Sequence, residues 1–206
     1  MPDPTSTPTP HPSPTPSRIV SERVVLEGRK FNFAELQVRD PDGQTRPKMV
    51  VRHPGAVVVV PILDRGGIPH VVMIRNDRYA VAARGPAILD ELPAGTIETD
   101  TGRPDGRPDD PAETARRECI EETGYDPRAL TPLGWFYTTP GMTDEMMHAF
   151  AATDLEHVGQ RLEADESIAV VLRPAAEALA MLDRGELHDA KTMLALLLAH
   201  RRGLLG

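Results

Sequence analysis

Several features that would narrow the function of a protein are scarce in this chain of 206 residues. Its one cysteine, Cys119, excludes an intramolecular disulfide, and no CxxC pair is present to bind zinc. Folding a chain of this length buries roughly 70% of its surface, so a core can form without crosslinks. The scarcity of cysteine predicts a reducing, cytoplasmic location.

Long hydrophobic runs and excess positive charge are also missing. The longest apolar run, residues 56–63, contains Pro61 and is far shorter than the ~20 residues that a membrane-spanning helix needs. The chain has 23 basic and 31 acidic residues, for a net charge of −8, which repels nucleic acid and anionic membrane surfaces. We therefore expect no membrane segment and no nucleic-acid partner.

The composition divides the chain at residue 17. Residues 1–17 consist only of Met, Pro, Asp, Thr, Ser and His, which predicts a disordered tail without the apolar stretch of a signal peptide. Residues 18–206 have the length and composition of one globular domain.

Short β-type runs dominate the first part of that domain, and helices with clear end signals follow. Residues 57–60 are all valine, which predicts a central strand covered on both faces. The fold class is therefore α/β, or an α+β sandwich, with a mixed β-sheet between helices. The predicted strands are 19–26, 31–38, 48–53, 55–63, 70–74, 133–137, 148–152 and 167–172, and the predicted helices are 111–123, 174–183 and 189–200.

The helix predicted at 111–123 carries the densest polar chemistry. Asp110 is a suitable N-cap and Gly124 a suitable C-terminal residue. At about 100° per residue, Glu118, Glu121 and Glu122 fall on one side of this helix, with no cation on the same side. Oxygen ligands of this kind suit Mg²⁺ or Mn²⁺. A solvated acidic face is the alternative.

The surrounding residues favour the metal site. Residues 117–125, Arg-Glu-Cys-Ile-Glu-Glu-Thr-Gly-Tyr, match the pattern R-E-U-x-E-E-x-G-U, in which U is bulky and apolar, and residues 91–95, Glu-Leu-Pro-Ala-Gly, precede them. This pattern resembles the Nudix box of Nudix hydrolases. The resemblance implies a β-sheet between helices, with the box folded as loop, helix and loop. It also implies hydrolysis of a nucleoside diphosphate linked to another group.

The resemblance also assigns roles within the box. It implies that Glu118, Glu122 and the backbone carbonyl of Ala94 bind divalent ions, Mg²⁺ or Mn²⁺. Glu121 would support that catalytic site, and Arg117 would orient its carboxylates. The spacing between the glycine and Asp109 is longer here than in the family pattern, and Asp109 replaces the usual glutamate. We expect the inserted segment, 99–108, to be a loop at the rim of the site.

Further residues resemble the ADP-ribose pyrophosphatase subgroup. Residues 140–145, Pro-Gly-Met-Thr-Asp-Glu, fit its P-G-x-[ST]-[DE]-E loop. By resemblance, Glu145 activates water or binds a metal, and Arg75 binds the diphosphate. If Glu145 is not the base, Asp144 in the same loop is the fallback. The substrate implied is ADP-ribose, hydrolysed to AMP and ribose 5-phosphate. Members of this subgroup are commonly homodimers joined through their N-terminal strands, so we expect a homodimer.

Recognition of the nucleoside is less well specified. Lys48 and Met49 stand where the subgroup usually carries Arg-Glu, so Lys48 is the candidate contact at that position. Aromatic residues make up only 4% of the chain, and Phe31, Phe33 and Tyr79 are the candidates for stacking on a base. The alternatives are a hydrolase of another nucleotide sugar or dinucleotide, a non-catalytic ligand sensor with this fold, and an acidic interaction domain.

Overall fold

The computed structural model describes residues 17–99, 108–162 and 166–206. The tail predicted over 1–17 and the insertion predicted over 99–108 therefore lie, except for their end residues, outside the described residues. No helix in the described ranges combines the length and apolar character needed to cross a membrane. The chain divides after Val51 into two compact units.

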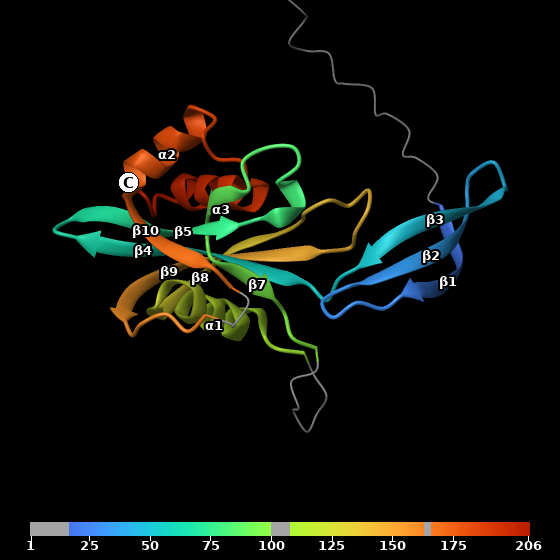
Figure 1. Ribbon diagram of the computed structural model, residues 1–206, viewed down its shortest axis with the longest axis horizontal. Coiled ribbons are helices and arrows are strands. Elements are labelled where there is room, and N and C mark those ends of the chain that lie inside the picture. The colour runs from blue at the N-terminus through green and yellow to red at the C-terminus, as the bar shows by residue number, and fades with distance from the viewer. Residues whose placement is uncertain (1–16, 100–107, 163–165) are drawn as a thin grey trace, which may run out of the picture. The chain divides into compact units, whose positions relative to one another are not determined.

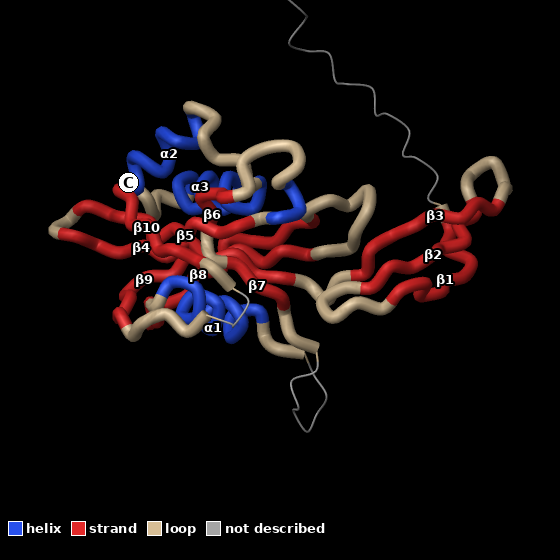
Figure 2. Tube along the Cα trace, in the orientation of Figure 1, coloured by secondary structure: helices blue, strands red, loops and turns tan. Residues whose placement is uncertain are grey.

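The first unit is a three-stranded sheet in the order β1-β2-β3 (Figure 2). Its strands are β1 (Arg18–Leu26), β2 (Asn32–Arg39) and β3 (Thr45–Arg52). Alternate residues of β2, namely Ala34, Leu36 and Val38, are buried, whereas β1 is exposed along its whole length. This unit therefore buries little apolar surface by itself.

The second unit contains a seven-stranded mixed sheet whose main path runs β10-β5-β4-β9-β8 (Figure 1). β4 is parallel to β9 and antiparallel to β5, and the short strands β6 and β7 pair with β5 and β4. A short 3₁₀ helix, η1 (Tyr79–Val81), follows β5. The strands are β4 (Ala56–Arg65), β5 (Ile68–Asp77), β6 (Ile88–Glu91), β7 (Ala94–Thr96), β8 (Tyr125–Tyr137), β9 (Met146–His157) and β10 (Ile168–Pro174).

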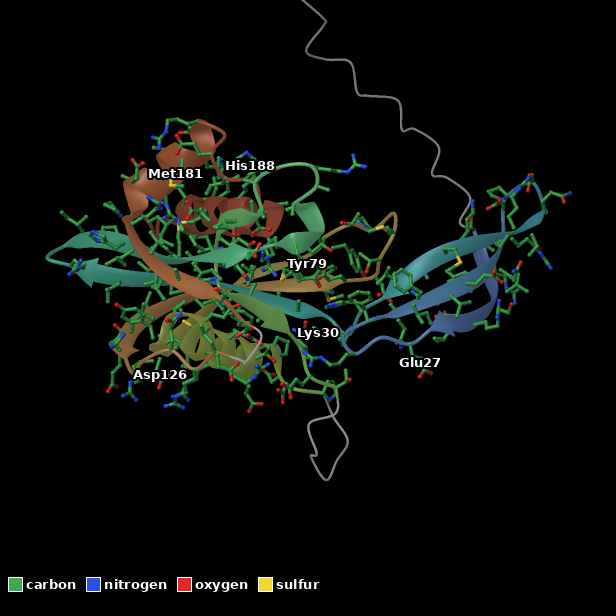
Figure 3. All side chains as sticks on the ribbon, in the orientation of Figure 1. Glu27, Lys30, Tyr79, Asp126, Met181 and His188 are labelled. Atoms are coloured by element: carbon green, nitrogen blue, oxygen red, sulfur yellow. The ribbon has the colours of Figure 1, made fainter. Side chains whose placement is uncertain are left out.

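Helices cover both faces of this sheet, as the alternation along β4 shows. Val58 and Val60 pack in one cluster with α2 (Ala175–Asp183) and α3 (Ala190–Arg201). Val57 and Val59 pack in another with α1 (Pro111–Thr123). Figure 3 labels Met181 on α2, which is 4% exposed in the first cluster. The predicted mixed sheet between helices is confirmed.

Most predicted elements agree with the observed ones within a few residues, and α1 agrees at both ends. β6 and β7 were not predicted, because four and three residues are too few for a sequence pattern. The first half of β8 was missed because it contains Pro127 and Pro132. β8 lies at the edge of the main path, where a strand tolerates prolines.

Candidate active site

The ends of α1 fix which of its side chains face the sheet. The Asp110 side chain accepts a hydrogen bond from the Ala112 N–H at 2.8 Å, and Gly124 ends the helix with a φ of 76°. Within this frame Glu118 and Glu122 are 8% and 4% exposed, on the side of α1 packed on the sheet. Glu121 is half-buried. The two side chains among the three predicted metal ligands are therefore buried.

The segment before α1 meets these two carboxylates. A Cβ placed on Gly95 would lie 1.9 Å from Glu118 Cδ and 2.0 Å from its Oε1, so only glycine admits Glu118 at this distance. One residue earlier, the Ala94 N–H donates a hydrogen bond to Glu122 Oε2 at 2.8 Å. Glu118 and Glu122 thus converge on the Ala94–Gly95 backbone, the meeting expected from the sequence.

The electrostatic environment of Glu118 and Glu122 favours a bound cation. Burial raises the pKa of Glu122 to about 8, an effect that the hydrogen bond from Ala94 opposes and the negative charges of Glu118 and Glu166 strengthen. A carboxylate so placed is costly to ionise alone and is readily neutralised by a positive ion. The atoms that could bind a cation here are carboxylate and carbonyl oxygens, which are the ligands that Mg²⁺ prefers.

These residues fit a divalent ion that takes only part of its ligands from protein. In the described ranges, no three acidic, histidine or cysteine side chains are grouped closely enough to hold a metal ion by themselves. Mg²⁺ usually keeps several waters and binds one or two carboxylates together with substrate phosphates. Glu118, Glu122 and the Ala94 carbonyl would provide the protein's share of such a site.

Arg117 corrects one expectation from the helix geometry. The sequence placed no cation on the side of the three glutamates, but the long Arg117 side chain reaches that side. Its Nη1 lies 2.9 Å from Glu118 Oε1 and 2.9 Å from Glu121 Oε2. Arg117 therefore pairs with two of the three acids, which agrees with an orienting role.

The loop at 140–145 contacts residues 52–53, which lead from β3 to β4. Asp144 accepts a hydrogen bond from the His53 N–H at 2.9 Å and pairs with Arg52 at 3.0 Å. Glu145 accepts a hydrogen bond from the Thr138 hydroxyl at 2.5 Å, and its Oε1 lies 3.8 Å from His53 Nε2. The two acids therefore differ in their contacts, because Asp144 anchors the loop to the Arg52 side chain and the His53 backbone.

Two arginines follow one another closely at the end of β5, and they face different partners. Arg75, the predicted diphosphate ligand, pairs through Nε with Asp90 at 2.9 Å. Arg78 contacts Glu91 and lies close enough to Glu122 for the charge of Glu122 to help raise the Arg78 pKa. Arg78 is therefore a cation beside the carboxylate site, which the sequence analysis overlooked.

The other predicted substrate contacts belong to the first unit. Phe33 is 38% exposed and lies edge-to-face with Phe31, with 5.8 Å between ring centroids. Lys48 is exposed on β3. Tyr79, labelled in Figure 3, is 87% exposed in the second unit, beside Arg78.

Sequence reasoning also missed Glu166. Burial is the main cause of the raised Glu122 pKa, and the negative charge of Glu166 adds to it. No motif in the sequence marks Glu166. For Arg78 a signal existed, because a second arginine follows Arg75 by three residues.

Known proteins resemble this chain in sequence and in fold. The NUDIX domain family matches residues 52–196. An ADP-ribose pyrophosphatase of Bacillus subtilis is 31% identical over 181 residues, covering 87% of this chain and 90% of the relative. A GDP-mannose pyrophosphatase of Yersinia enterocolitica is 38% identical over 154 residues, covering 70% of this chain and 78% of the relative.

A solved structure described as that of an ADP compounds hydrolase has the same fold. Its TM-score is 0.72 at 24% identity, with 93% of this chain and 96% of that chain covered. The chain belongs to the NUDIX domain family. It is an enzyme of the Nudix pyrophosphatase type.

Proposed function

We propose that this enzyme hydrolyses the diphosphate bond of ADP-ribose, giving AMP and ribose 5-phosphate, with Mg²⁺ or Mn²⁺ as cofactor. The observation that carries the proposal is the convergence of buried Glu118 and Glu122 on Ala94 and Gly95. The relative from Bacillus subtilis, named an ADP-ribose pyrophosphatase, supports the choice of substrate.

Each site residue has a role that follows from its contacts. Glu118, Glu122 and the Ala94 carbonyl would hold the ion, which when bound offsets phosphate charge and polarises water. Arg117 holds Glu118 and Glu121 in place through its Nη1 contacts. These are the residues that would fix the diphosphate relative to the attacking water.

The diphosphate also needs cations from the protein. Arg78 lies beside Glu122, and its guanidinium is partly exposed, so it can contact a phosphate oxygen. Arg75 is also partly exposed, but Asp90 holds its Nε. We propose Arg78 as the main contact and Arg75 as the second.

Glu145 is the proposed base. A carboxylate that coordinates an ion is a weak base, which argues against Glu118 and Glu122. Glu145 keeps a hydrogen bond from Thr138 and lies on a loop held by Asp144. Asp144 is the fallback, although its contacts with Arg52 and the His53 N–H make it the anchor of this loop.

A second substrate class has its own support. The GDP-mannose pyrophosphatase of Yersinia enterocolitica is 38% identical to this chain, and Lys48 with Met49 replaces the usual Arg-Glu pair. Phe33 and Lys48, both at least partly exposed, are the proposed nucleoside contacts in either case. Another nucleotide sugar or a dinucleotide is therefore the alternative substrate.

A substrate panel tests the choice directly. We expect the highest kcat/KM for ADP-ribose among ADP-ribose, GDP-mannose, other nucleoside diphosphate sugars and dinucleotides, with Mg²⁺ and Mn²⁺ tested separately. A higher value for GDP-mannose would transfer the proposal to the second class. Equal hydrolysis of every compound would show that neither nucleoside contact is selective.

We further propose that residues 18–206 act as one functional domain and that the protein is a cytoplasmic homodimer. Eight large apolar side chains of the first unit are exposed, and apolar side chains exposed together mark interaction surfaces. They are Ile19, Val20, Val24, Val25, Leu26, Phe31, Phe33 and Met49. A second copy of the chain is the proposed partner. Cys119 is buried as a free thiol, which suits a reducing compartment.

A further inference from the structure

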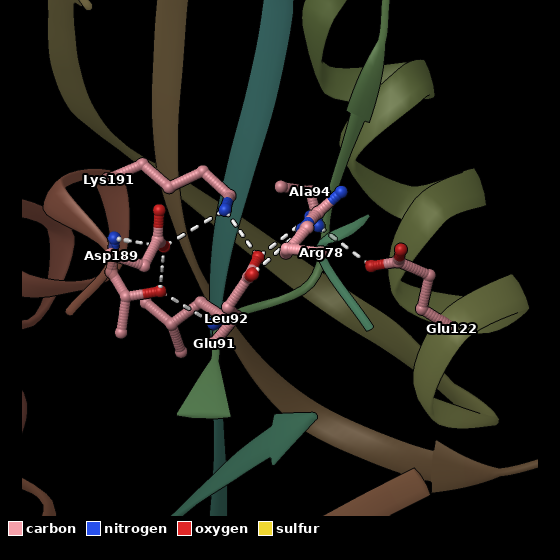
Figure 4. A network of polar contacts seen from close by, with 8 residues as sticks. Arg78, Glu91, Leu92, Ala94, Glu122, Asp189 and Lys191 are labelled. Carbon is pink, nitrogen blue, oxygen red and sulfur yellow. Dashed lines mark hydrogen bonds and ion pairs between the residues drawn. The ribbon is translucent and has the colours of Figure 1, made fainter. Parts of the chain in front are cut away.

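A buried carboxylate joins two parts of the second unit that are far apart in sequence. Glu91, at the end of β6, is 1% exposed. Arg78 donates to both of its oxygens, from Nε at 2.8 Å and from Nη2 at 2.7 Å. Lys191, near the start of α3, donates to Glu91 Oε2 at 2.5 Å, as Figure 4 shows.

The start of α3 holds the neighbouring backbone as well. Asp189 caps α3 and lies 2.9 Å from Lys191 Nζ. The Thr192 hydroxyl accepts a hydrogen bond from the Leu92 N–H at 2.8 Å and donates one to Asp189 Oδ2 at 2.5 Å. Thr192 is fully buried, so these hydrogen bonds are shielded from water.

The segment 91–94 is consequently fixed from both faces of the sheet. α3 contacts it at Glu91 and Leu92, and α1 contacts it at Ala94 through Glu122. The core clusters place α1 and α3 on opposite faces. Helix α3 contributes no metal-site residue, yet it is connected to the site through this segment (Figure 4).

Stability alone is a weak reason for such a network. A buried ion pair costs desolvation, and apolar residues of similar volume often stabilise a protein as well or better. The charged hydrogen bonds also fix the orientation of the side chains that make them. Glu91 uses Nε and Nη2 of Arg78, which sets the plane of the guanidinium and leaves its Nη1 edge for another partner. The Arg78 side chain is 41% exposed, so that edge is within reach of a ligand.

We propose that Lys191 is a positioning residue that acts through Glu91 to orient Arg78 for a substrate diphosphate. The inference rests on the proposed function, because it takes Arg78 as a diphosphate contact. Lys191 and Arg78 Nη2 both donate to Glu91 Oε2, and Glu91 in turn holds the guanidinium. Without Lys191, the carboxylate is free to turn and Arg78 turns with it.

Replacing Lys191 tests the proposal. For Lys191→Met we expect KM for ADP-ribose to rise about tenfold while kcat changes less than about threefold, because a lost binding orientation acts on ground and transition states alike. The Kd of a non-hydrolysable α,β-methylene analogue of ADP-ribose, measured by calorimetry, rises by the same factor. Lys191→Arg, which keeps a cation, restores most of the affinity. Lys191→Gln gives an intermediate value and serves if Lys191→Met does not fold.

Arg202 offers a matched control at the other end of α3. Its Nη1 and Nη2 donate to the Pro132 and Leu133 carbonyls at 2.6 and 3.0 Å. Arg202→Met removes an anchor at the end of α3 whose hydrogen-bond partners are the Pro132 and Leu133 carbonyls and not Glu91. We expect it to lower Tm while KM and the analogue Kd stay at the wild-type values. If Lys191→Met behaves in the same way, Lys191 is merely structural and the proposal is overturned.

A double variant tests the route through Arg78. If Lys191 acts on binding by orienting Arg78, Lys191→Met adds no further rise in Kd to Arg78→Met. A full tenfold addition would overturn the proposed route. A wild-type enzyme that hydrolyses no diphosphate of the panel would contradict the proposed function instead, and analogue binding still reports on Lys191.

Discussion

Glu122 illustrates how a single residue can be poorly suited to the metal-free protein and well suited to a cation site. It is 4% exposed, it receives one backbone hydrogen bond from Ala94, and its pKa is raised to about 8 by burial. Glu118, one helical turn away, strengthens the effect. Both the role of Glu122 in turnover and its effect on stability can be measured.

Glu122→Gln keeps the shape of the side chain and removes the charge. We expect turnover to fall at least ~10²-fold at saturating Mg²⁺, because a bound ion contributes several kcal/mol to the transition state. Steady-state kinetics measure this, with circular dichroism to verify folding. Near-normal turnover would show that the ion is held elsewhere.

The same variant alters the pH dependence of the metal-free protein. Because burial raises the Glu122 pKa from its ordinary 4.5 to about 8, the folded state binds more protons than the unfolded state between these values. Stability therefore falls as pH rises from about 5 to 8. Glu122→Gln removes this slope and stabilises the metal-free protein at pH 8 by an amount on the order of a few kcal/mol. Urea unfolding at pH 5 and pH 8, in chelator, measures the difference, and parallel curves for the two proteins would contradict the assigned cause.

Glu145 and Asp144 differ in the contacts they make, and the difference is testable. Glu145→Gln should lower kcat by ~10² to 10⁴, the usual contribution of a general base, with KM and metal affinity nearly unchanged. Kinetics and Mn²⁺ titration separate these quantities. A large loss of metal affinity would make Glu145 a ligand, and full activity would show that another residue is the base. Asp144→Asn serves as the comparison. It weakens the contacts of the loop with residues 52–53 but keeps the Glu145 carboxylate, so it separates a loosened loop from a lost base.

At the scale of elements, the approach of β7 to α1 creates the site. Gly95 lies on β7, and its lack of a side chain lets Glu118 lie against the strand. Gly95→Ala would place a Cβ 1.9 Å from Glu118 Cδ, so the carboxylate has to move away.

We expect the turnover of Gly95→Ala to fall at least ~10²-fold, as when a catalytic group is displaced, while the fold is kept. Steady-state kinetics measure the turnover, and Tm checks the fold. Gly85→Ala is the matched control, because a Cβ there meets no atom within 4 Å and the residue lies outside the proposed site. Unchanged activity in Gly95→Ala would contradict a catalytic need for Glu118 to lie against the Gly95 backbone.

How far the sequence predicts the elements depends on how local their signals are. α1 could be predicted to the residue because Asp110, Pro111 and Gly124 encode its ends within a few positions. β6 and β7 could not, because they exist only by pairing with β5 and β4. The closeness of Glu118 and Glu122 to residues 94–95 could be expected from the Nudix-box pattern. The ion pair between Glu91 and Lys191 could not, because it joins residues 100 positions apart and no local pattern marks it.

At the scale of the whole molecule, the exposed first unit carries the dimer proposal. Leu26, at the end of β1, is 61% exposed. If β1 is covered by a second copy, Leu26→Asp buries a charge in the interface and should shift the protein to a monomer. Light scattering after gel filtration measures the mass. Ile68→Asp, at a 56% exposed position in β5, is the control and should leave the mass unchanged. A wild type that is monomeric at all concentrations would contradict the proposal.

The most direct test of the central claim is the identity of the products formed from ADP-ribose. The wild-type enzyme with Mg²⁺ should give AMP and ribose 5-phosphate in equal amounts by chromatography, with no reaction in excess chelator. ADP-ribose left intact, or the same products formed at the same rate in chelator, would contradict the account of Glu118 and Glu122 as the residues that hold a catalytic ion.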